Sequence, residues 1–127
     1  MSRKPPTFIL PEVRIDKNKR KPSDPEYDPT SVYISQNDYR ILSDGMKRYW
    51  DIKKNNMEKI LFWRFGDWYV VYYEDLQICT KYLDMCITPF PGCPQVGFEH
   101  FHLDRNVGAM TERGYKVAVC EQKETRD

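Results

Sequence analysis

The 127-residue sequence has no apolar run long enough to cross a membrane and no cysteine pair at Cys-x-x-Cys spacing. A membrane helix needs about 18 consecutive apolar residues, and a secretory signal needs an apolar core that residues 1–6 do not supply. The phosphate-loop, Gly-x-Ser-x-Gly and Gly-x-Gly-x-x-Gly motifs are also missing. We therefore expect a soluble, intracellular protein with no membrane segment and no catalytic constellation.

The sequence has few residues that could bind a metal ion or act as a thiol nucleophile. The cysteines are Cys79, Cys86, Cys93 and Cys120. We interpret them as reduced thiols, because a chain with 14% aromatic residues does not depend on disulfides to fold. His100 and His102 with Cys93 and Cys120 offer four zinc donors, but their spacing fits no standard module, which favours loop histidines and core thiols. The apolar patterns around Cys79 and Cys120 disfavour a nucleophile, since burial raises a thiol pKa.

Charge is unevenly distributed along the chain. Residues 1–24 hold seven Lys or Arg against three acids, which leaves thirteen against sixteen in the rest, although the net charge is only +1. Strong sequence-independent DNA binding depends on clustered Lys and Arg. Any nucleic-acid role of the globular part must therefore depend on particular residues.

The first 30 residues differ in composition from the rest. They contain six of the nine prolines and the run Lys17-Asn18-Lys19-Arg20-Lys21. Proline lacks a backbone donor, and this segment has little apolar surface to bury. We expect a basic, proline-rich flexible arm over residues 1–30, followed by one domain over residues 31–127. Two interpretations of the basic run stay open, a nuclear address and an ordinary solvated tail.

The remaining sequence alternates between helical and strand patterns. The most strongly β-prone runs flank Gly66-Asp67, a two-residue connection suited to a type I′ or II′ hairpin. The fold class we expect is α/β (mixed α+β): a single domain with a mixed β-sheet and a central hairpin flanked by about three helices. The predicted elements are a short strand at 32–34, a helix at 46–55, strands at 59–65 and 68–73, a helix at 74–83, a strand at 85–88, a rigid proline loop at 89–94, a helix at 101–113 ending at Gly114, and a strand at 115–120.

The second hairpin strand, GDWYVVYYED, carries aromatics on both faces. Alternation places Trp68, Val70 and Tyr72 on one face and Tyr69, Val71 and Tyr73 on the other. One interpretation is a strand that helices bury on both faces. The other is an aromatic wedge or stacking platform, of the kind that enters a minor groove or stacks on a base.

Several segments, in order, resemble the N-terminal mismatch-recognition domain of the MutS family. They are RFGDWYVVY (64–72), the following Glu-Asp helix, the unit from Gly97 to Gly114, and YKVAVCEQ (115–122). The resemblance runs from about residue 24 to residue 127. The upstream segments DPEYDPTSVYI and GMKRYWDIK are most similar to the eukaryotic MutS homologue six subfamily.

The resemblance implies roles for four DNA-binding residues. In the family, a Phe enters the minor groove and stacks on the mispaired base, and a Glu two residues later hydrogen-bonds that base. Those positions are Trp68 and Val70 here. Trp68 keeps a flat aromatic face, whereas Val70 has no hydrogen-bonding side chain. Arg64 is expected either to contact phosphate or to form a salt bridge within the hairpin. Val96 falls where the family places a small residue beside the wedge.

The resemblance also implies a larger setting. The partners it implies are double-stranded DNA with mismatches and a second MutS homologue subunit in a heterodimer, in the nucleus. We expect no cofactor and no enzyme activity in this chain, since the family's ATPase, with its ATP and Mg²⁺, belongs to other domains of a full-length parent. An excised domain is favoured over a free-standing relic. The alternative function is a diverged domain that serves as a structural or partner-binding module without mismatch readout.

Overall fold

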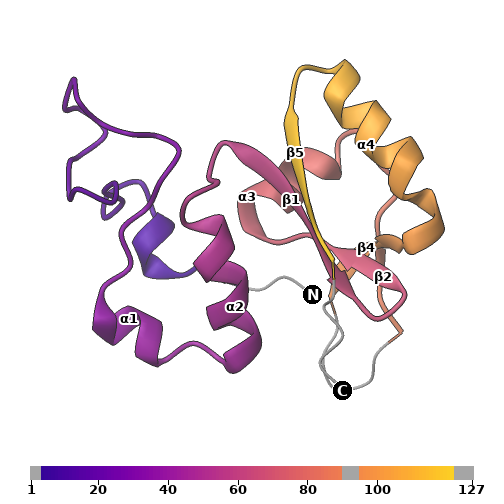
Figure 1. Cartoon of the computed structure of the whole chain (residues 1–127), viewed down its shortest axis with the longest axis horizontal. Helices are drawn as coiled ribbons and strands as arrows, with labels where there is room; N and C mark the ends of the chain where they lie inside the picture. Colours follow the sequence, from indigo (N-terminus) through magenta and orange to yellow (C-terminus); the bar gives the residue numbers. More distant parts are fainter. Residues whose placement is uncertain (1–3, 90–94, 122–127) are drawn as a thin grey trace. The chain divides into compact units, whose positions relative to one another are not determined.

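The computed structural model describes residues 4–89 and 95–121, which fall into two compact units (Figure 1). One unit contains residues 4–58, and the other contains the described residues from 59 onward. The predicted proline loop lies outside the described residues from position 90 to 94. The division at residue 30 and the flexibility of residues 1–30 stay predictions.

The unit of residues 4–58 contains η1 (Thr7–Ile9), α1 (Gln36–Arg40) and α2 (Asp44–Lys53). The predicted helix at 46–55 is confirmed as α2, with Ser43 as its N-cap: the Ser43 hydroxyl accepts from the Met46 amide at 3.2 Å. Helix α1, a short helix that Ser35 caps, was not predicted. Inside the unit the Phe8 and Trp50 rings meet edge to face, with centroids 4.9 Å apart.

The short strand predicted at 32–34 is wrong. Residues 31–35 form no strand, because neighbouring amides bond to different segments: Val32 donates to the Lys54 carbonyl and Tyr33 to that of Ile15, each at 2.9 Å. A ladder needs successive bonds to one partner strand. The segment nevertheless joins α2 to the first 30 residues.

The second unit is a five-stranded mixed sheet with helices, which confirms the mixed α/β class. Its strand order is β3-β4-β2-β1-β5; β1 and β5 are parallel, and the other pairs are antiparallel. The elements are β1 (Lys59–Phe65), β2 (Trp68–Val70), α3 (Tyr73–Cys79), β3 (Cys86–Ile87), β4 (Val96–Glu99), η2 (His100–His102), α4 (Leu103–Glu112) and β5 (Lys116–Cys120).

The hairpin is confirmed. Gly66 has φ 62° and Asp67 does not have a positive φ, which fits a type II′ turn. The second strand is shorter than predicted, because Tyr73 adopts φ 56° and starts α3 there. Asp75, in the first turn of α3, is buried and accepts the Leu61 amide of β1 at 3.0 Å. Helix α3 is thus fixed to the central strand, and it ends at Cys79 rather than at the predicted Leu83.

The remaining predicted elements agree with the structure, with one omission. The predictions at 85–88, 101–113 and 115–120 are confirmed as β3, α4 and β5 with small shifts at their ends. Gly114 has φ 90°, and the next amide, of Tyr115, returns to the Met110 carbonyl at 3.1 Å, a C-terminal cap. Strand β4 was missed, because four residues that include a glycine carry little strand signal.

One face of the sheet carries the core of this unit. Its buried residues include Ile60, Phe62, Tyr69, Val71, Phe98 and Met110. Phe62 and Phe98 meet edge to face at 5.0 Å between centroids. Side chains of α3 and α4 pack against the same cluster, so the core face of the hairpin is covered by helices.

Gly97 of β4 lies very close to the backbone of β2, and substitution there should destabilise this unit. A Cβ at Gly97 would lie 2.0 Å from the Tyr69 carbonyl oxygen. We expect Gly97→Ala to lower the free energy of unfolding by about 3 kcal/mol, measured by urea denaturation. Gly108→Ala is the matched control: nothing lies within 4 Å of its Cβ position in α4, so stability should rise by ~0.5–1 kcal/mol. Equal effects would contradict the close approach.

Candidate nucleic-acid interface

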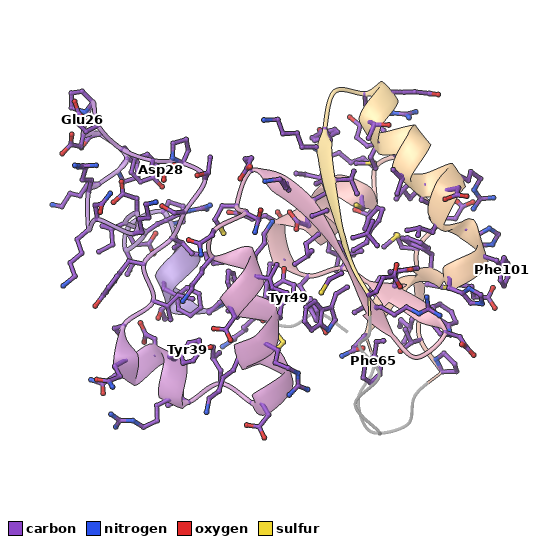
Figure 2. All side chains as sticks on the ribbon, viewed as in Figure 1. Glu26, Asp28, Tyr39, Tyr49, Phe65 and Phe101 are labelled. Carbon is purple, nitrogen blue, oxygen red and sulfur yellow. The ribbon has the colours of Figure 1, made fainter. Side chains whose placement is uncertain are left out.

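The turn of the hairpin brings aromatic side chains to the end of the sheet. Trp68, the first residue of β2, pairs with Phe65 of β1 and with Glu99 of β4. Directly paired residues share a face of a sheet, so the three side chains lie on the face opposite the core. Trp68 is partly exposed. Phe65, whose side chain is labelled in Figure 2, is 37% exposed. Two aromatic rings therefore lie beside Gly66 and Asp67, with the exposed Glu99 next to Trp68 in the same row.

Exposure ends abruptly after Trp68. Val70 lies two residues further along the same face and has 0% exposure, and Tyr69, Val71 and Tyr72 are also buried. Val70 pairs with Trp63 and Gly97, which are its neighbours on either side in the sheet. The interpretation of a strand buried on both faces thus holds from Tyr69 to Tyr72. In this structure Val70 serves packing, while Trp68 keeps exposed surface.

Arg64 is engaged within the hairpin. Its Nε donates to the Gly66 carbonyl at 2.6 Å, and its Nη1 lies 3.2 Å from the Tyr69 hydroxyl. The same Nη1 forms an ion pair with Glu121 at 3.3 Å, and the guanidinium lies over the Tyr69 ring at 5.2 Å from the centroid. The salt bridge weighed in the sequence analysis is therefore present. A phosphate contact by Arg64 stays a prediction.

Tyr69 of β2, Arg64 of β1 and Glu121, the residue after β5, form a row across one end of the sheet. Tyr69 pairs with Arg64, and Glu121 follows Cys120, the partner of Trp63. The Tyr69 hydroxyl donates to the Glu121 carboxylate at 2.6 Å. Burial, and then the hydrogen bond to Glu121, raises the pKa of Tyr69. This row links the turn carbonyl of Gly66 to the end of β5, so it fixes the hairpin that carries Trp68.

Val96 lies in β4, next to the hairpin strand, but not beside the wedge position. Its carbonyl accepts the Val71 amide at 3.0 Å, and its partner on the other side is Ile87. The β4 residue paired with Trp68 is Glu99, three positions later, which corresponds to about 10 Å along a strand. The structure therefore brings Trp68 together with Phe65 and Glu99 rather than with Val96.

The contact between the turn and η2 was not predicted. The His100 amide donates to the Asp67 carbonyl at 2.9 Å, which attaches η2 to the turn. Phe101 follows and is 65% exposed (Figure 2). Glu121 was part of a segment resembling the MutS family, but no role was assigned to it. The contacts of His100 and Glu121 have no local sequence signal, because they join residues that are distant along the chain.

Metal and thiol sites find no support in the described part of the chain. No group of three His, Cys, Asp or Glu that could hold a metal ion occurs in residues 4–89 and 95–121, and Cys93 lies outside these ranges. Cys79 is buried, and burial followed by the nearby Glu121 raises the pKa of Cys120. Both are consistent with packing thiols. No helix among the described residues is long and apolar enough for a membrane span.

The comparisons with known proteins all indicate similarity to the same family of DNA mismatch repair proteins. The family described as MutS domain I matches residues 43–127. The DNA mismatch repair protein MSH7 of Arabidopsis thaliana is 36% identical over 114 residues, covering 88% of this chain and 10% of that protein. MSH6 of the same plant is 31% identical (90% of this chain, 8% of the relative), and Msh6 of Homo sapiens is 28% identical (93% and 9%). The chain spans about a tenth of the length of these curated relatives.

Removing the Tyr69 hydroxyl should weaken the hairpin without disturbing the core. Tyr69→Phe keeps the ring and loses the bonds to Glu121 and Arg64, so we expect the free energy of unfolding to fall by about 1–3 kcal/mol at neutral pH. A raised folded pKa means that the contribution is present below the ordinary value of 10.0 and is lost as pH rises through the folded pKa.

The difference between wild type and Tyr69→Phe should therefore shrink in alkaline solution. Urea denaturation of both proteins from pH 7 to pH 11 measures it. Tyr27→Phe, in the other unit, is the control and should leave the pH dependence unchanged. A difference that stays constant with pH would contradict the role of the hydroxyl.

Proposed function

We propose, because the chain belongs to the MutS family and carries its domain I, that the β1–β2 hairpin presents Trp68 as an aromatic wedge to a mispaired or deformable step of duplex DNA. The observation that carries the proposal is the exposure along β2. Trp68, next to the turn, keeps exposed surface, whereas Tyr69 and Val70 are buried. The strand thus places one large aromatic ring outward on a rigid base.

Physical chemistry explains how such a ring distinguishes a mismatch. A wedge in the minor groove must partly unstack a base step and kink the duplex, which costs a few kcal/mol per step. A mispaired step is already weakened, so it opens and bends at lower cost. Stacking of the exposed base on an aromatic ring returns about 1–3 kcal/mol. Trp68 would therefore read deformability rather than base identity.

The residue at position 70 limits how this hairpin can recognise a mispaired base. The resemblance implied a hydrogen-bonding Glu there, and Val70 has neither a polar group nor exposed surface. We infer that discrimination by this hairpin lacks the polar check of the base. Phe65, paired with Trp68 and partly exposed, widens the apolar surface instead.

The larger setting is carried over from the relatives. Those described above are named DNA mismatch repair proteins, and this chain matches about a tenth of each. We propose that the chain acts within a nuclear mismatch-repair protein, alongside a second MutS homologue subunit. ATP and Mg²⁺ would then bind outside this chain, in an ATPase of the parent protein. The chain itself would contribute contact with mismatched double-stranded DNA and no catalysis.

Truncating Trp68 should remove the preference for a mismatch. We expect Trp68→Ala to weaken binding to a duplex with one G·T mismatch by about 1–3 kcal/mol and to leave binding to the matched duplex unchanged. Fluorescence anisotropy with labelled duplexes at low salt measures both affinities. Partial exposure of Trp68 makes the change tolerable for folding.

The control is Trp68→Phe, which keeps an aromatic face and should retain most of the preference. An unaltered preference in Trp68→Ala would disprove the wedge. Unfolding curves of both variants separate a binding effect from a stability effect.

The alternative is a structural or partner-binding module without mismatch readout. Two observations favour it: Val70 is wholly buried, and Arg64 is engaged by Gly66, Tyr69 and Glu121. A hairpin specialised for packing would show both features. In that case the Trp68 indole resonance should shift when a protein partner is added and stay in place when mismatched DNA is added.

Placing the carboxylate of the family at position 70 tests the same choice. A carboxylate at a position without exposed surface loses its hydration, so we expect Val70→Glu to lower the free energy of unfolding by about 3 kcal/mol. Val70→Thr, of similar shape, should cost less. A stable Val70→Glu variant with increased preference for the mismatched duplex would instead favour the wedge over the packing module.

A further inference from the structure

The basic run at residues 17–21 is folded around a buried carboxylate. Asp16 has 0% exposure, and its Oδ1 accepts the amides of Asn18 and Arg20, each at 2.8 Å. Its Oδ2 accepts the Asp28 amide, also at 2.8 Å. Backbone bonds close the turn, with the Asp16 amide donating to the Arg20 carbonyl at 3.0 Å and the Lys19 amide donating to the Asp16 carbonyl at 2.8 Å. The run is a closed turn.

The backbone of this turn is strained at a lysine. Lys19 has φ 65°, in the left-handed region that costs a residue with a Cβ roughly 1 kcal/mol or more. Such conformations persist where surrounding bonds over-determine them, and here the Asp16 carboxylate and backbone bonds do so. The bonds of the turn therefore hold Lys19 in a conformation that it would rarely adopt alone.

The cations of the turn lie outward and the anion lies inward. Lys17, Lys19 and Lys21 are exposed, and the Lys19 ammonium lies over the Tyr33 ring at 4.9 Å from its centroid. Arg20 is partly exposed, with one Nη donating to the Glu26 carbonyl at 3.2 Å. Burial alone would raise the pKa of Asp16, but the amides of Arg20, Asp28 and Asn18 and the charge of Arg20 outweigh it, so its pKa lies below the usual value. The carboxylate is taken up by backbone donors rather than by the lysines.

The chemistry of this surface suits a polyanion. Four cations within five residues repel one another, and a phosphodiester backbone relieves that repulsion by replacing its own counterions. Acids do occur in the adjoining turn: Asp24 accepts the Glu26 amide with its own side chain, and Glu26 is exposed at the tip (Figure 2). Asp28 also lies near Lys17: hydrogen bonds from Thr30, and then the bond from Ser31 and the charge of Lys17, lower the pKa of Asp28. All three acids lie outside the stretch from Lys17 to Lys21.

We propose that residues 17–21 form a phosphate-binding turn that holds a nucleic-acid backbone irrespective of base sequence. The choice of DNA as the polyanion rests on the proposed function, but the turn does not depend on Trp68. It would supply sequence-independent affinity, whereas the hairpin would supply discrimination.

The experiment compares salt dependence in the full 127-residue chain. In one variant Lys17, Lys19 and Lys21 become Gln; in the control Arg40, Lys47 and Arg48, in the same unit, become Gln. We expect the first variant to bind matched and mismatched duplexes more weakly by the same factor. The slope of log affinity against log salt should become shallower by up to about three, and the control should change it less.

The variant Asp16→Asn distinguishes DNA binding by the folded turn from simple attraction by net positive charge. The change raises the net charge by one, so simple attraction predicts tighter DNA binding. The proposed turn predicts weaker binding, because the single Asn oxygen can replace only one carboxylate oxygen: if it accepts from Asn18 and Arg20, the Asn amide nitrogen faces the Asp28 N–H donor and the link between positions 16 and 28 is lost. Lys19→Gly relieves the positive φ, so it should preserve folding and reduce the slope by about one.

An unchanged salt slope in the Lys variant, an equal loss in the control, or tighter binding by Asp16→Asn would overturn the proposal. Unchanged duplex binding together with lost nuclear accumulation of a fluorescent fusion would overturn it in favour of a nuclear address. If no variant or wild type prefers the mismatched duplex while the slope changes as expected, the hairpin function fails and the phosphate-binding turn stands.

Discussion

The register of the β1–β2 hairpin is the constraint on which the candidate interface depends. The two-residue connection Gly66-Asp67 pairs Phe65 with Trp68, which sends Trp68 outward and Tyr69 into the core. A slip of one residue would exchange the two faces, burying the indole and exposing the phenol. Gly66 at positive φ, the carbonyl bond from Arg64 and the close approach of Gly97 all fix this register.

Local chemistry made much of the fold predictable. The hairpin follows from β-prone runs around Gly-Asp, α2 from its Ser43 cap, and the end of α4 from Gly114. What failed was set by tertiary contacts. Residues 32–34 form hydrogen bonds with two separate segments rather than with one strand. Strand β4 has little strand signal in its own sequence, and it forms because β2 and β3 pair with it on either side.

The candidate site was predictable only where it depends on local sequence rather than on tertiary contacts. Trp68 could be identified from its place beside the turn, but the burial of Val70 depends on what the rest of the fold places around it. The row formed by Tyr69, Arg64 and Glu121 spans more than fifty positions of sequence, so no local pattern encodes it. The proposals together assign affinity and discrimination to different units of the chain, which allows one to change while the other is kept.

The carboxylate of Asp16 acts on its segment as a cross-link. It joins positions 16 and 28 in a segment that contains turns and no strand or α-helix. A disulfide or a zinc ion joins the loops of a small scaffold in a similar way. Unlike a disulfide, this link is indifferent to redox conditions, and unlike a metal site it needs no free ion. The link is sensitive to acid instead, because protonation of Asp16 removes the negative charge that strengthens its hydrogen bonds with the three backbone amides.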